Sequence, residues 1–304
     1  MSFTAKDVKE LREKTGAGMM DCKKALTEND GNIETAIDFL RAKGLAAAAK
    51  KATRVAAEGL IGSVVEGNVG VVVEINCETD FVAKNDDFKK FVGTIANHLV
   101  SSPAKDVAAL NEEKVGNQKV SELVQELTLK IGEKIDIRRF EKKSIDGAGK
   151  VGSYVHGGKI GVLVELASDK EDVTKSDEFN ALLADLCLHT AASDPKFLKA
   201  DEIDEDFKKR EAEVYEAQLK DQGKPENMIP NIIKGKLNKL ASEVCLFEQK
   251  FVKDPDMTIS KLVEKVGKDL GANLTINGFS KLSLGEGIEK KEDNLADEVA
   301  KLTK

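Results

Sequence analysis

The chain has 304 residues, of which 41% are hydrophobic and 33% charged, and its formal net charge is −7. This length and composition predict about two globular domains with a substantial core. Phosphate binding needs a concentrated positive face, and no basic cluster stands apart from the acidic background, so direct binding of nucleic acid is not expected.

The sequence also argues against membrane, metal and cofactor binding. No apolar stretch approaches the roughly 20 residues that cross a bilayer, and the start MSFTAKDVKELREKTG has neither a signal-peptide core nor a transit segment. The four cysteines (Cys22, Cys77, Cys187 and Cys245) contain no C-x-x-C pair and, with three scattered histidines, form no zinc spacing. We therefore expect a cytoplasmic protein with buried, reduced thiols and no metal or cofactor of its own.

Three short helices are predicted at the N-terminus, in the segments 4–16, 18–30 and 32–44. Thr4 and Asn32 are suitable N-caps, and glycines 16, 18, 31 and 44 provide the breaks. The alanine-rich segment that follows predicts a linker helix. We assign residues 1–55 to this N-terminal module and its linker.

The rest of the chain contains an internal duplication. The matching pairs, in chain order, are GSVVEGNVGVVVEI (62–75) with GSYVHGGKIGVLVEL (152–166), Phe88 with Phe179, His98 with His189, and GEKIDIRRF (132–140) with GANLTINGF (271–279). Each copy begins with two apolar strands around a glycine-rich turn, which predicts a β-hairpin, and continues with helices and a closing strand. The sequence thus predicts two related α+β subdomains with antiparallel sheets, at 56–145 and 146–285.

The second copy is longer, and its extra residues fall between His189 and Gly271. A spacing of three and four residues predicts two helices, with apolar seams at Ile203, Phe207, Val214 and Ala217, and at Ile229, Ile233, Leu237, Leu240 and Val244. Gly223 and Pro225 suit the link between them. We expect an antiparallel coiled-coil hairpin at about 200–248, interrupted by Arg210, and a short C-terminal helical module at 286–304.

Differences between the two copies indicate function, because a residue present in both is expected to serve the shared fold. By this criterion His98 and His189 are structural. His156 corresponds to Glu66 of the first copy, so it differs between the copies and is a candidate contact residue. The alternative is a solvated turn histidine that happens to differ.

The stretch ETDFVAKND (78–86) is the largest difference between the copies. The second copy reads SDKEDVTKSDEF, in which polar and acidic residues replace Asp80, Phe81 and Val82. We therefore favour an exposed Phe81 that binds a partner over a core Phe81. Burying this ring in a partner contributes roughly 1.5–3 kcal/mol, the scale of an interface hot spot.

No catalytic signature is present. The sequence contains no suggested Ser/His/Asp or Cys/His set, no G-x-x-x-x-G-K-[ST] loop and no G-x-G-x-x-G after a strand. A binding protein of several modules is favoured, a partner-binding scaffold or chaperone-like protein is the alternative, and a nucleotide-processing enzyme is the weakest reading.

Several long motifs resemble the bacterial elongation factor Ts family. LREKTGAGMMDCKKAL (11–26) and NCETDFVAKN (76–85) are similar to its two signature stretches, and GSYVHGGKIGVLVEL and GEGIEKKEDNLADEVAKL (285–302) to its later segments. The resemblance implies a guanine nucleotide exchange factor for elongation factor Tu in translation elongation. It also implies an N-terminal module similar to a ubiquitin-associated domain that docks on the GTP-binding domain. Ubiquitin binding by residues 1–43 is the alternative for that module.

The resemblance also implies contact residues. Thr79, Asp80, Phe81 and Val82 match the segment linked to loss of Mg²⁺ from the GTPase, with Phe81 as a wedge between helices. The other implied contacts are His156 near the phosphate loop, Met19, Met20 and Lys23 on the N-terminal surface, and Ile131 with Gly132. For one of the two methionines, core packing is the alternative. No residue is expected to be catalytic.

Overall fold

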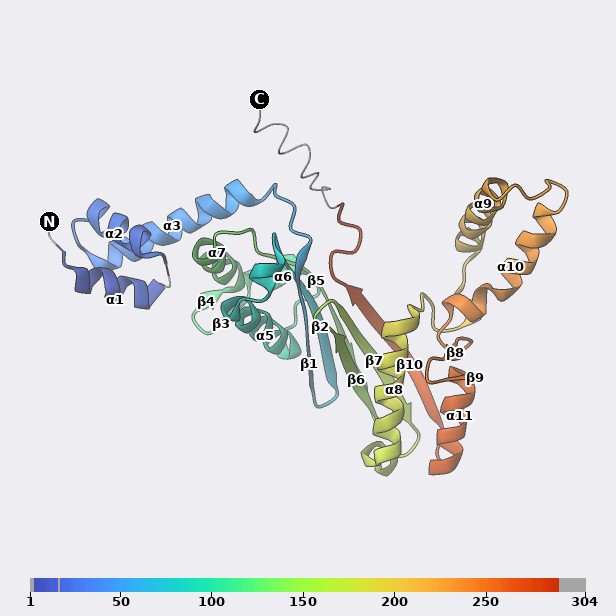
Figure 1. The fold of residues 1–304 in the computed structure, drawn as a ribbon. Coiled ribbons are helices and arrows are strands. Elements are labelled where there is room, and N and C mark those ends of the chain that lie inside the picture. The colour runs from blue at the N-terminus through green and yellow to red at the C-terminus, as the bar shows by residue number, and fades with distance from the viewer. Residues whose placement is uncertain (1–2, 16, 290–304) are drawn as a thin grey trace.

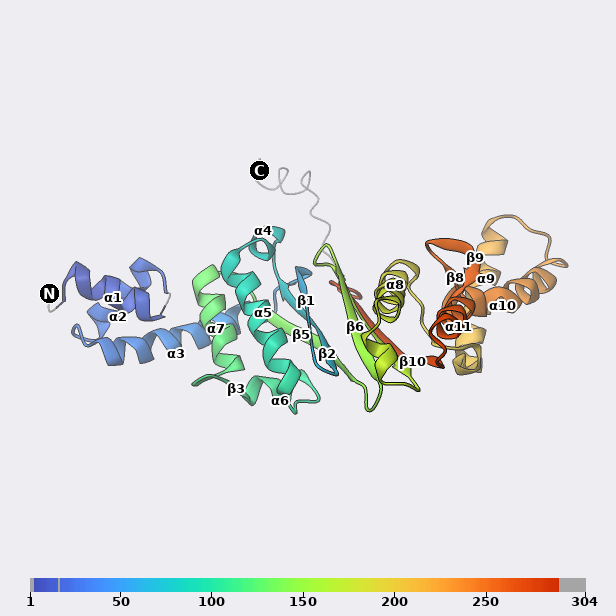
Figure 2. The ribbon, with the colours of Figure 1, turned by 90° about the horizontal axis from the view of Figure 1, so that it is seen from below.

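The computed structural model describes residues 3–15 and 17–289 of an α+β protein (Figure 1). Figure 2 shows an elongated molecule in which a helical bundle, two sheets with helices on their outer faces, and a helical arm follow one another. Antiparallel pairing in both large sheets confirms the predicted α+β class with antiparallel sheets. The domain boundaries given above remain predictions.

The N-terminal bundle consists of α1 (Ala5–Thr15), α2 (Met19–Glu28) and α3 (Ile33–Lys51). Both predicted N-caps are confirmed: Thr4 accepts a hydrogen bond from the Asp7 N–H, and Asn32 accepts from the N–H groups of residues 34 and 35. The predicted break at Gly44 is wrong, because α3 continues through it to Lys51 and is itself the linker helix. Gly44 is buried, and a Cβ added there would lie 3.7 Å from the Gln125 carbonyl of the core.

The first sheet has the order β1-β2-β5, with a layer of helices on its outer face. Its elements are β1 (Glu58–Glu66), β2 (Val69–Cys77), α4 (Asp80–Ala83), α5 (Asp86–Ser101), α6 (Val107–Glu112), β3 (Lys114–Val115), β4 (Gln118–Lys119), α7 (Val120–Ile131) and β5 (Asp136–Ser144). Side chains of β2, α5 and α7 form one core, which includes the fully buried Phe88.

The second sheet repeats this arrangement in the order β10-β7-β6. Its elements are β6 (Gly149–His156), β7 (Ile160–Ser168), η1 (Asp172–Lys175), α8 (Asp177–Ser193), η2 (Ala200–Glu202), β8 (Lys250–Phe251), β9 (Asp254–Thr258), α11 (Ile259–Leu270) and β10 (Leu274–Ser283). Phe179, the counterpart of Phe88, is fully buried in the second core.

His98 and His189 occupy equivalent places, as predicted. The Nε2 atom of His98 lies 2.7 Å from Glu113, and that of His189 lies 3.0 Å from Gln249. Glu113 and Gln249 each precede the small hairpin of their copy, and the carbonyl of each accepts a hydrogen bond from the first residue of the next helix. Both histidines therefore have structural partners within the chain.

The inner faces of the two sheets pack against each other, which the sequence analysis did not predict. The residues between them are apolar: Ile61, Val72, Ile145, Val151, Leu163 and Leu282. Gly70 and Gly161 permit the close approach, since a Cβ on Gly161 would lie 2.3 Å from Cγ2 of Ile61. One core thus joins the duplicated halves.

Glu74 fastens the chain beyond β10 to the first sheet. Its fully buried carboxylate accepts hydrogen bonds from the Gly285 N–H (2.7 Å), Arg139 (2.6 Å) and Arg138 (3.0 Å). Burial opposes ionisation, but these hydrogen bonds outweigh it and hold the pKa of Glu74 below its usual value. Gly285 and Gly287 have positive φ in the predicted turn, whereas most of the predicted C-terminal helix lies outside the described residues.

The helical arm consists of α9 (Glu205–Asp221) and α10 (Ile229–Val244), linked through Gly223 at φ +69°. These two helices and their link confirm that the insert is helical, and its coiled-coil packing stays a prediction. The predicted seam of the first helix is wrong at Val214, which is 48% exposed, and at the exposed Ala217. Tyr215 and Leu219 are buried instead.

Arg210 is exposed, so it does not interrupt the seam as predicted. A cluster of Ile203, Leu240 and Cys245 anchors the base of the arm.

All four cysteines are buried free thiols, as expected. Burial raises the pKa of Cys77 and of Cys187 to about 12, so neither is a thiolate at neutral pH. Among residues 3–15 and 17–289, no helix has the length and apolar character needed to cross a bilayer. The same residues contain no cluster of three His, Cys, Asp or Glu side chains suited to a metal ion.

Candidate partner-binding site

The helical turn α4 exposes Phe81 and buries the residue after it. Phe81 is 80% exposed, as the comparison of the two copies predicted, whereas Val82 is 9% exposed and packs in the first core. Thr79 caps the turn by accepting a hydrogen bond from the Val82 N–H (3.4 Å). A short hydrogen-bonded turn anchored by Val82 therefore holds the backbone from which the exposed ring projects.

The second copy differs from the α4 segment less than predicted. At the same offset Val82 corresponds to Val173 of η1, which is 7% exposed, so the statement that a polar residue replaces Val82 is wrong. Phe81 does correspond to a polar residue, the exposed Asp172. The comparison thus assigns Val82 to the shared fold and leaves Phe81 as an exposed apolar residue whose counterpart in the second copy is polar.

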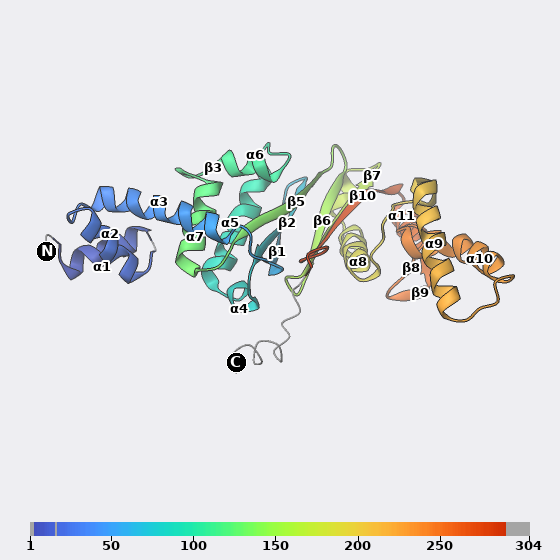
Figure 3. The ribbon, with the colours of Figure 1, turned by 90° about the horizontal axis from the view of Figure 1, so that it is seen from above.

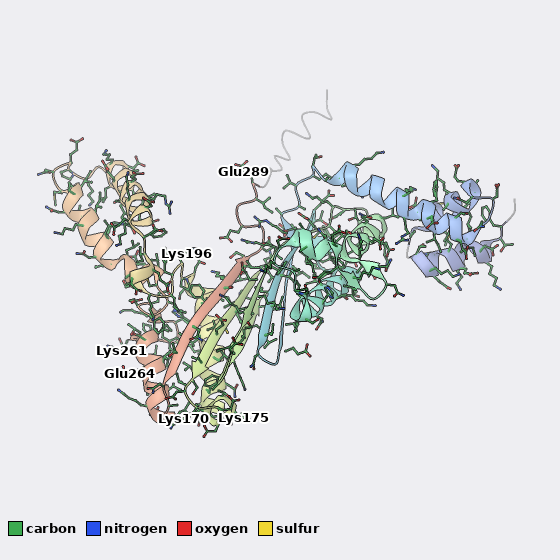
Figure 4. All side chains as sticks on the ribbon, turned by 180° about the vertical axis from the view of Figure 1, so that it is seen from behind. Lys170, Lys175, Lys196, Lys261, Glu264 and Glu289 are labelled. Carbon is green, nitrogen blue, oxygen red and sulfur yellow. The ribbon has the colours of Figure 1, made fainter. Side chains whose placement is uncertain are left out.

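Figure 4 locates this counterpart segment in the molecule. Lys170 and Lys175, which flank it, lie at the end of the second sheet where β10 begins.

Lys84 binds Asp80 and places its ammonium group over the Phe81 ring. Its Nζ atom donates to Asp80 Oδ2 at 2.7 Å and lies 5.8 Å from the centroid of the ring. This hydrogen bond, together with the positive charges of Lys84 and Lys159, holds the pKa of Asp80 below its usual value. Asp80 is therefore ionised at neutral pH and already has a partner inside the chain.

Glu133 fixes the segment that enters α4. Its carboxylate accepts hydrogen bonds from the Glu78 N–H (3.1 Å), the Thr79 N–H (3.0 Å) and the Thr79 hydroxyl (2.7 Å). Glu133 comes directly after Ile131 and Gly132, so these two predicted contact residues adjoin Thr79. Ile131 is half-buried against the first core, and Gly132 is exposed with φ +89°.

Glu133 was not among the predicted site residues, although the sequence contains a signal for it. At the offset that relates Gly132 to Gly271, its counterpart is Ala272, so the carboxylate occurs in one copy only.

His156 is exposed at the end of β6, next to the turn that leads into β7. Its Nδ1 atom lies 3.0 Å from the Tyr154 hydroxyl, and the centroids of the two rings are 6.1 Å apart. The same turn reaches the first copy, because the Ile61 N–H of β1 donates to the Gly158 carbonyl at 2.8 Å. Since α4 also packs beside β1, the structure brings the His156 turn to the neighbourhood of α4.

Met19, Met20 and Lys23 form a separate surface on α2. Met19 is 58% exposed, Met20 is 74% exposed, and Lys23 is exposed as well, so neither methionine side chain is part of the core. Figure 3 shows α1 and α2 at one end of the molecule, apart from α4. The predicted contact residues therefore belong to two regions, one around α4 and one on the N-terminal bundle.

Comparison with known proteins identifies the family. The family model described as "Elongation factor TS" matches residues 78–286. The protein named "Elongation factor Ts" of Trichlorobacter lovleyi is 48% identical over 306 residues, covering 99% of this chain and 98% of that protein. Proteins of the same name from Clostridium novyi (49% over 302 residues, 97% of both chains) and Syntrophotalea carbinolica (48% over 307 residues, 100% of both chains) are similar as well. The chain belongs to the elongation factor Ts family of translation elongation factors.

Proposed function

We propose that this chain is the guanine nucleotide exchange factor of elongation factor Tu, and that it promotes GDP release by inserting Phe81 near the Mg²⁺ and phosphate site of that GTPase. The observation that carries this proposal is the exposure of Phe81 on an anchored turn, in a chain that belongs to the elongation factor Ts family. A large ring that is 80% exposed on a rigid support is suited to enter a pocket of another protein.

The physical effect follows from how such a GTPase holds its nucleotide. Mg²⁺ and backbone N–H groups of the GTPase bind the phosphates of the nucleotide. Displacing the helices that carry these phosphate-binding groups therefore lowers the affinity for GDP. A thousandfold weakening requires about 4 kcal/mol of coupling, and burial of one Phe supplies roughly 1.5–3 kcal/mol. Other contacts must therefore supply the rest of the coupling free energy.

The residues around Phe81 have distinct roles in this proposal. Thr79 and Val82 hold the turn, one as its cap and the other by packing in the core. Asp80, paired with Lys84, orients the turn and contacts the displaced helix, because a single carboxylate is a poor Mg²⁺ site. His156 approaches the phosphate loop from the neighbouring turn, and Ile131 with Gly132 adds a contact beside Thr79.

The N-terminal module supplies a second contact. We infer that residues 1–55 resemble a ubiquitin-associated domain and dock on the GTP-binding domain through Met19, Met20 and Lys23. Exposed methionines suit this task because their flexible, polarisable side chains adapt to an apolar surface. The helical arm would reach a more distant part of the partner. In this account the protein acts in the cytoplasm, performs no chemistry of its own and needs no metal or nucleic acid.

Nucleotide-dependent affinity tests the proposal against a scaffold or chaperone-like protein. Factor and nucleotide weaken each other's binding reciprocally, so calorimetry should give a Kd for nucleotide-free elongation factor Tu at least about a thousandfold lower than for the GDP-bound form. Equal affinity for the two forms would support the scaffold and contradict exchange.

A further inference from the structure

Two sets of hydrogen bonds join the segment before α4 to the segment before β5. In the first set, the Glu133 carboxylate accepts from two backbone N–H groups and one hydroxyl: Oε2 binds the N–H groups of Glu78 and Thr79, and Oε1 binds the Thr79 hydroxyl. In the second set, the Lys134 N–H donates to Oε1 of Glu78 at 2.6 Å.

The second copy retains one of these sets and lacks the other. Asn273 and Asp169, the counterparts of Lys134 and Glu78, form the same backbone-to-carboxylate bond at 2.9 Å. Glu133 is replaced by Ala272, which has no carboxylate. The shared bond serves the duplicated fold, whereas the Glu133 bonds occur in the copy that carries an exposed Phe.

We propose that Glu133 is a positioning residue that fixes the direction of Phe81 for entry into the partner, an inference that rests on the proposed exchange function. Glu133 acts through Thr79, whose hydroxyl donates to Glu133 and accepts from the Val82 N–H in the first turn of α4. Removing the carboxylate frees the N-cap and lets the turn move. A ring that must enter a narrow site loses efficiency when its support is displaced by about 1 Å.

Two substitutions distinguish a positioning role of Glu133 from a direct charged contact between Glu133 and the partner. Glu133→Ala removes both acceptor oxygens, and with them all three hydrogen bonds, and makes the position like Ala272 of the second copy, so the chain is expected to fold. Glu133→Gln keeps the shape, because the amide oxygen can accept both N–H groups while the amide nitrogen donates to Oγ1 of Thr79. Positioning predicts that the Gln variant rescues activity, whereas a charged contact with the partner predicts that Gln is as damaging as Ala.

The experiment is the rate of fluorescent GDP release from elongation factor Tu over a range of factor concentrations. Glu133→Ala should lower kcat about tenfold or more with KM changed by less than about threefold, and Glu133→Gln should stay within about threefold of the parent. Asn273→Ala, which removes the 2.7 Å side-chain bond to Asp169 in the second copy, is the matched control and should behave as the parent. Parental activity of Glu133→Ala, or equal loss in both Glu133 variants, would overturn the proposal.

A double-substitution cycle adds a measurement that a merely structural role would not change. If Glu133 acts through the Phe81 ring, Glu133→Ala in a Phe81→Ala background should slow release by less than about twofold further. Independent, multiplying effects of the two substitutions would refute the assignment.

Amide hydrogen exchange of the free chain separates this proposal from the exchange function itself. Glu133→Ala should accelerate exchange of the amides in 78–83 about tenfold, and Glu133→Gln should leave them protected. If the parent chain fails to accelerate GDP release but this pattern appears, the exchange function is wrong and the positioning of α4 stands. If the pattern is absent, the positioning role is wrong whatever the release rates.

Discussion

At the scale of single residues, Phe81 and Val82 show how one helical turn combines an exposed aromatic ring with a residue of the core. They are neighbours in the chain, yet Phe81 is 80% exposed and Val82 is buried in the core of the first sheet. Thr79 begins the turn and Lys84 closes it by its bond to Asp80, so the buried valine and the two polar contacts hold the backbone that carries the exposed ring.

Phe81→Ala is expected to reduce the acceleration of GDP release about 10- to 150-fold, which corresponds to a loss of roughly 1.5–3 kcal/mol of burial in the partner. The ring is mostly solvated in the free chain, so the melting temperature should not change. Phe88→Ala is the contrast, because that ring is fully buried and its loss should destabilise the fold by about 3–5 kcal/mol. A parental release rate would exclude the wedge, and an unfolded Phe81→Ala protein would assign the ring to the core.

His189 predicts a pH dependence of stability. It is fully buried, its Nδ1 accepts from the Val252 N–H, and burial lowers its pKa below the ordinary value of 6.5. Because the unfolded chain takes up this proton more readily than the folded one, the stability contributed by neutral His189 is present above about pH 6.5. It is lost as the pH falls toward and through the folded pKa.

Denaturant titrations between about pH 7.5 and 5.5 should show a falling free energy of unfolding, with a slope of up to about 1.4 kcal/mol per pH unit from this group. The slope should be smaller in His189→Gln. An identical slope in the variant would show that other groups carry the dependence.

At the scale of elements, the helices α7 and α11 end in the same way but in different surroundings. Each ends in a glycine in the left-handed region, Gly132 at φ +89° and Gly271 at φ +62°, and a strand follows each. An added Cβ would meet nothing within 4 Å at either position. Only Gly132 is followed by a residue, Glu133, whose carboxylate accepts hydrogen bonds from Thr79.

Substituting either glycine by alanine should therefore cost a similar amount of stability, about 1 kcal/mol from backbone strain alone. Gly132→Ala should also slow GDP release severalfold, whereas Gly271→Ala should leave release unchanged. Thermal unfolding and release kinetics on both variants check this. Slower GDP release with both variants would mean that backbone strain anywhere in the fold is enough to slow release.

Local signals predicted the elements well, and long-range packing explains what they missed. The caps at Thr4 and Asn32, the hairpin turns and the link at Gly223 depend on a few adjacent residues, and the structure confirms them. The inward face of α9 was misplaced because apolar spacing alone does not reveal which of two adjacent stripes the partner helix covers.

The candidate site likewise combines features that local sequence predicts with features that depend on long-range contacts. Comparison of the two copies predicted the exposure of Phe81, a local property of one turn. The hydrogen bonds between Glu133 and Thr79 join residues far apart in the sequence. The packing of one sheet on the other depends on the assembled fold. Neither appears in local periodicity.

At the scale of the whole molecule, the packing of the two sheets brings the His156 turn near α4. Ile61 of β1 lies in the shared core and also donates its N–H to Gly158, the second residue after His156. The separation of the two sheets therefore influences the distance between two predicted contact regions that come from different copies.

Gly161→Ala tests this arrangement, because the added Cβ would lie 2.3 Å from Cγ2 of Ile61 and 2.5 Å from Cγ2 of Val72. These branched side chains are confined between the sheets, so we expect a loss of about 1–3 kcal/mol of stability and slower GDP release. Gly93→Ala is the control, since it lies in α5 with nothing within 4 Å and should stabilise by about 0.5–1 kcal/mol. Parental stability of Gly161→Ala would show that the sheets separate without cost.

The most direct test of the account is the release of a fluorescent GDP from purified elongation factor Tu, with and without this chain at substoichiometric amounts. We predict that a small amount of chain releases the nucleotide from a large excess of GTPase, at a rate that Phe81→Ala strongly reduces. Demonstrable binding of the chain without any acceleration would contradict the account and leave a partner-binding protein whose exposed Phe81 serves another purpose.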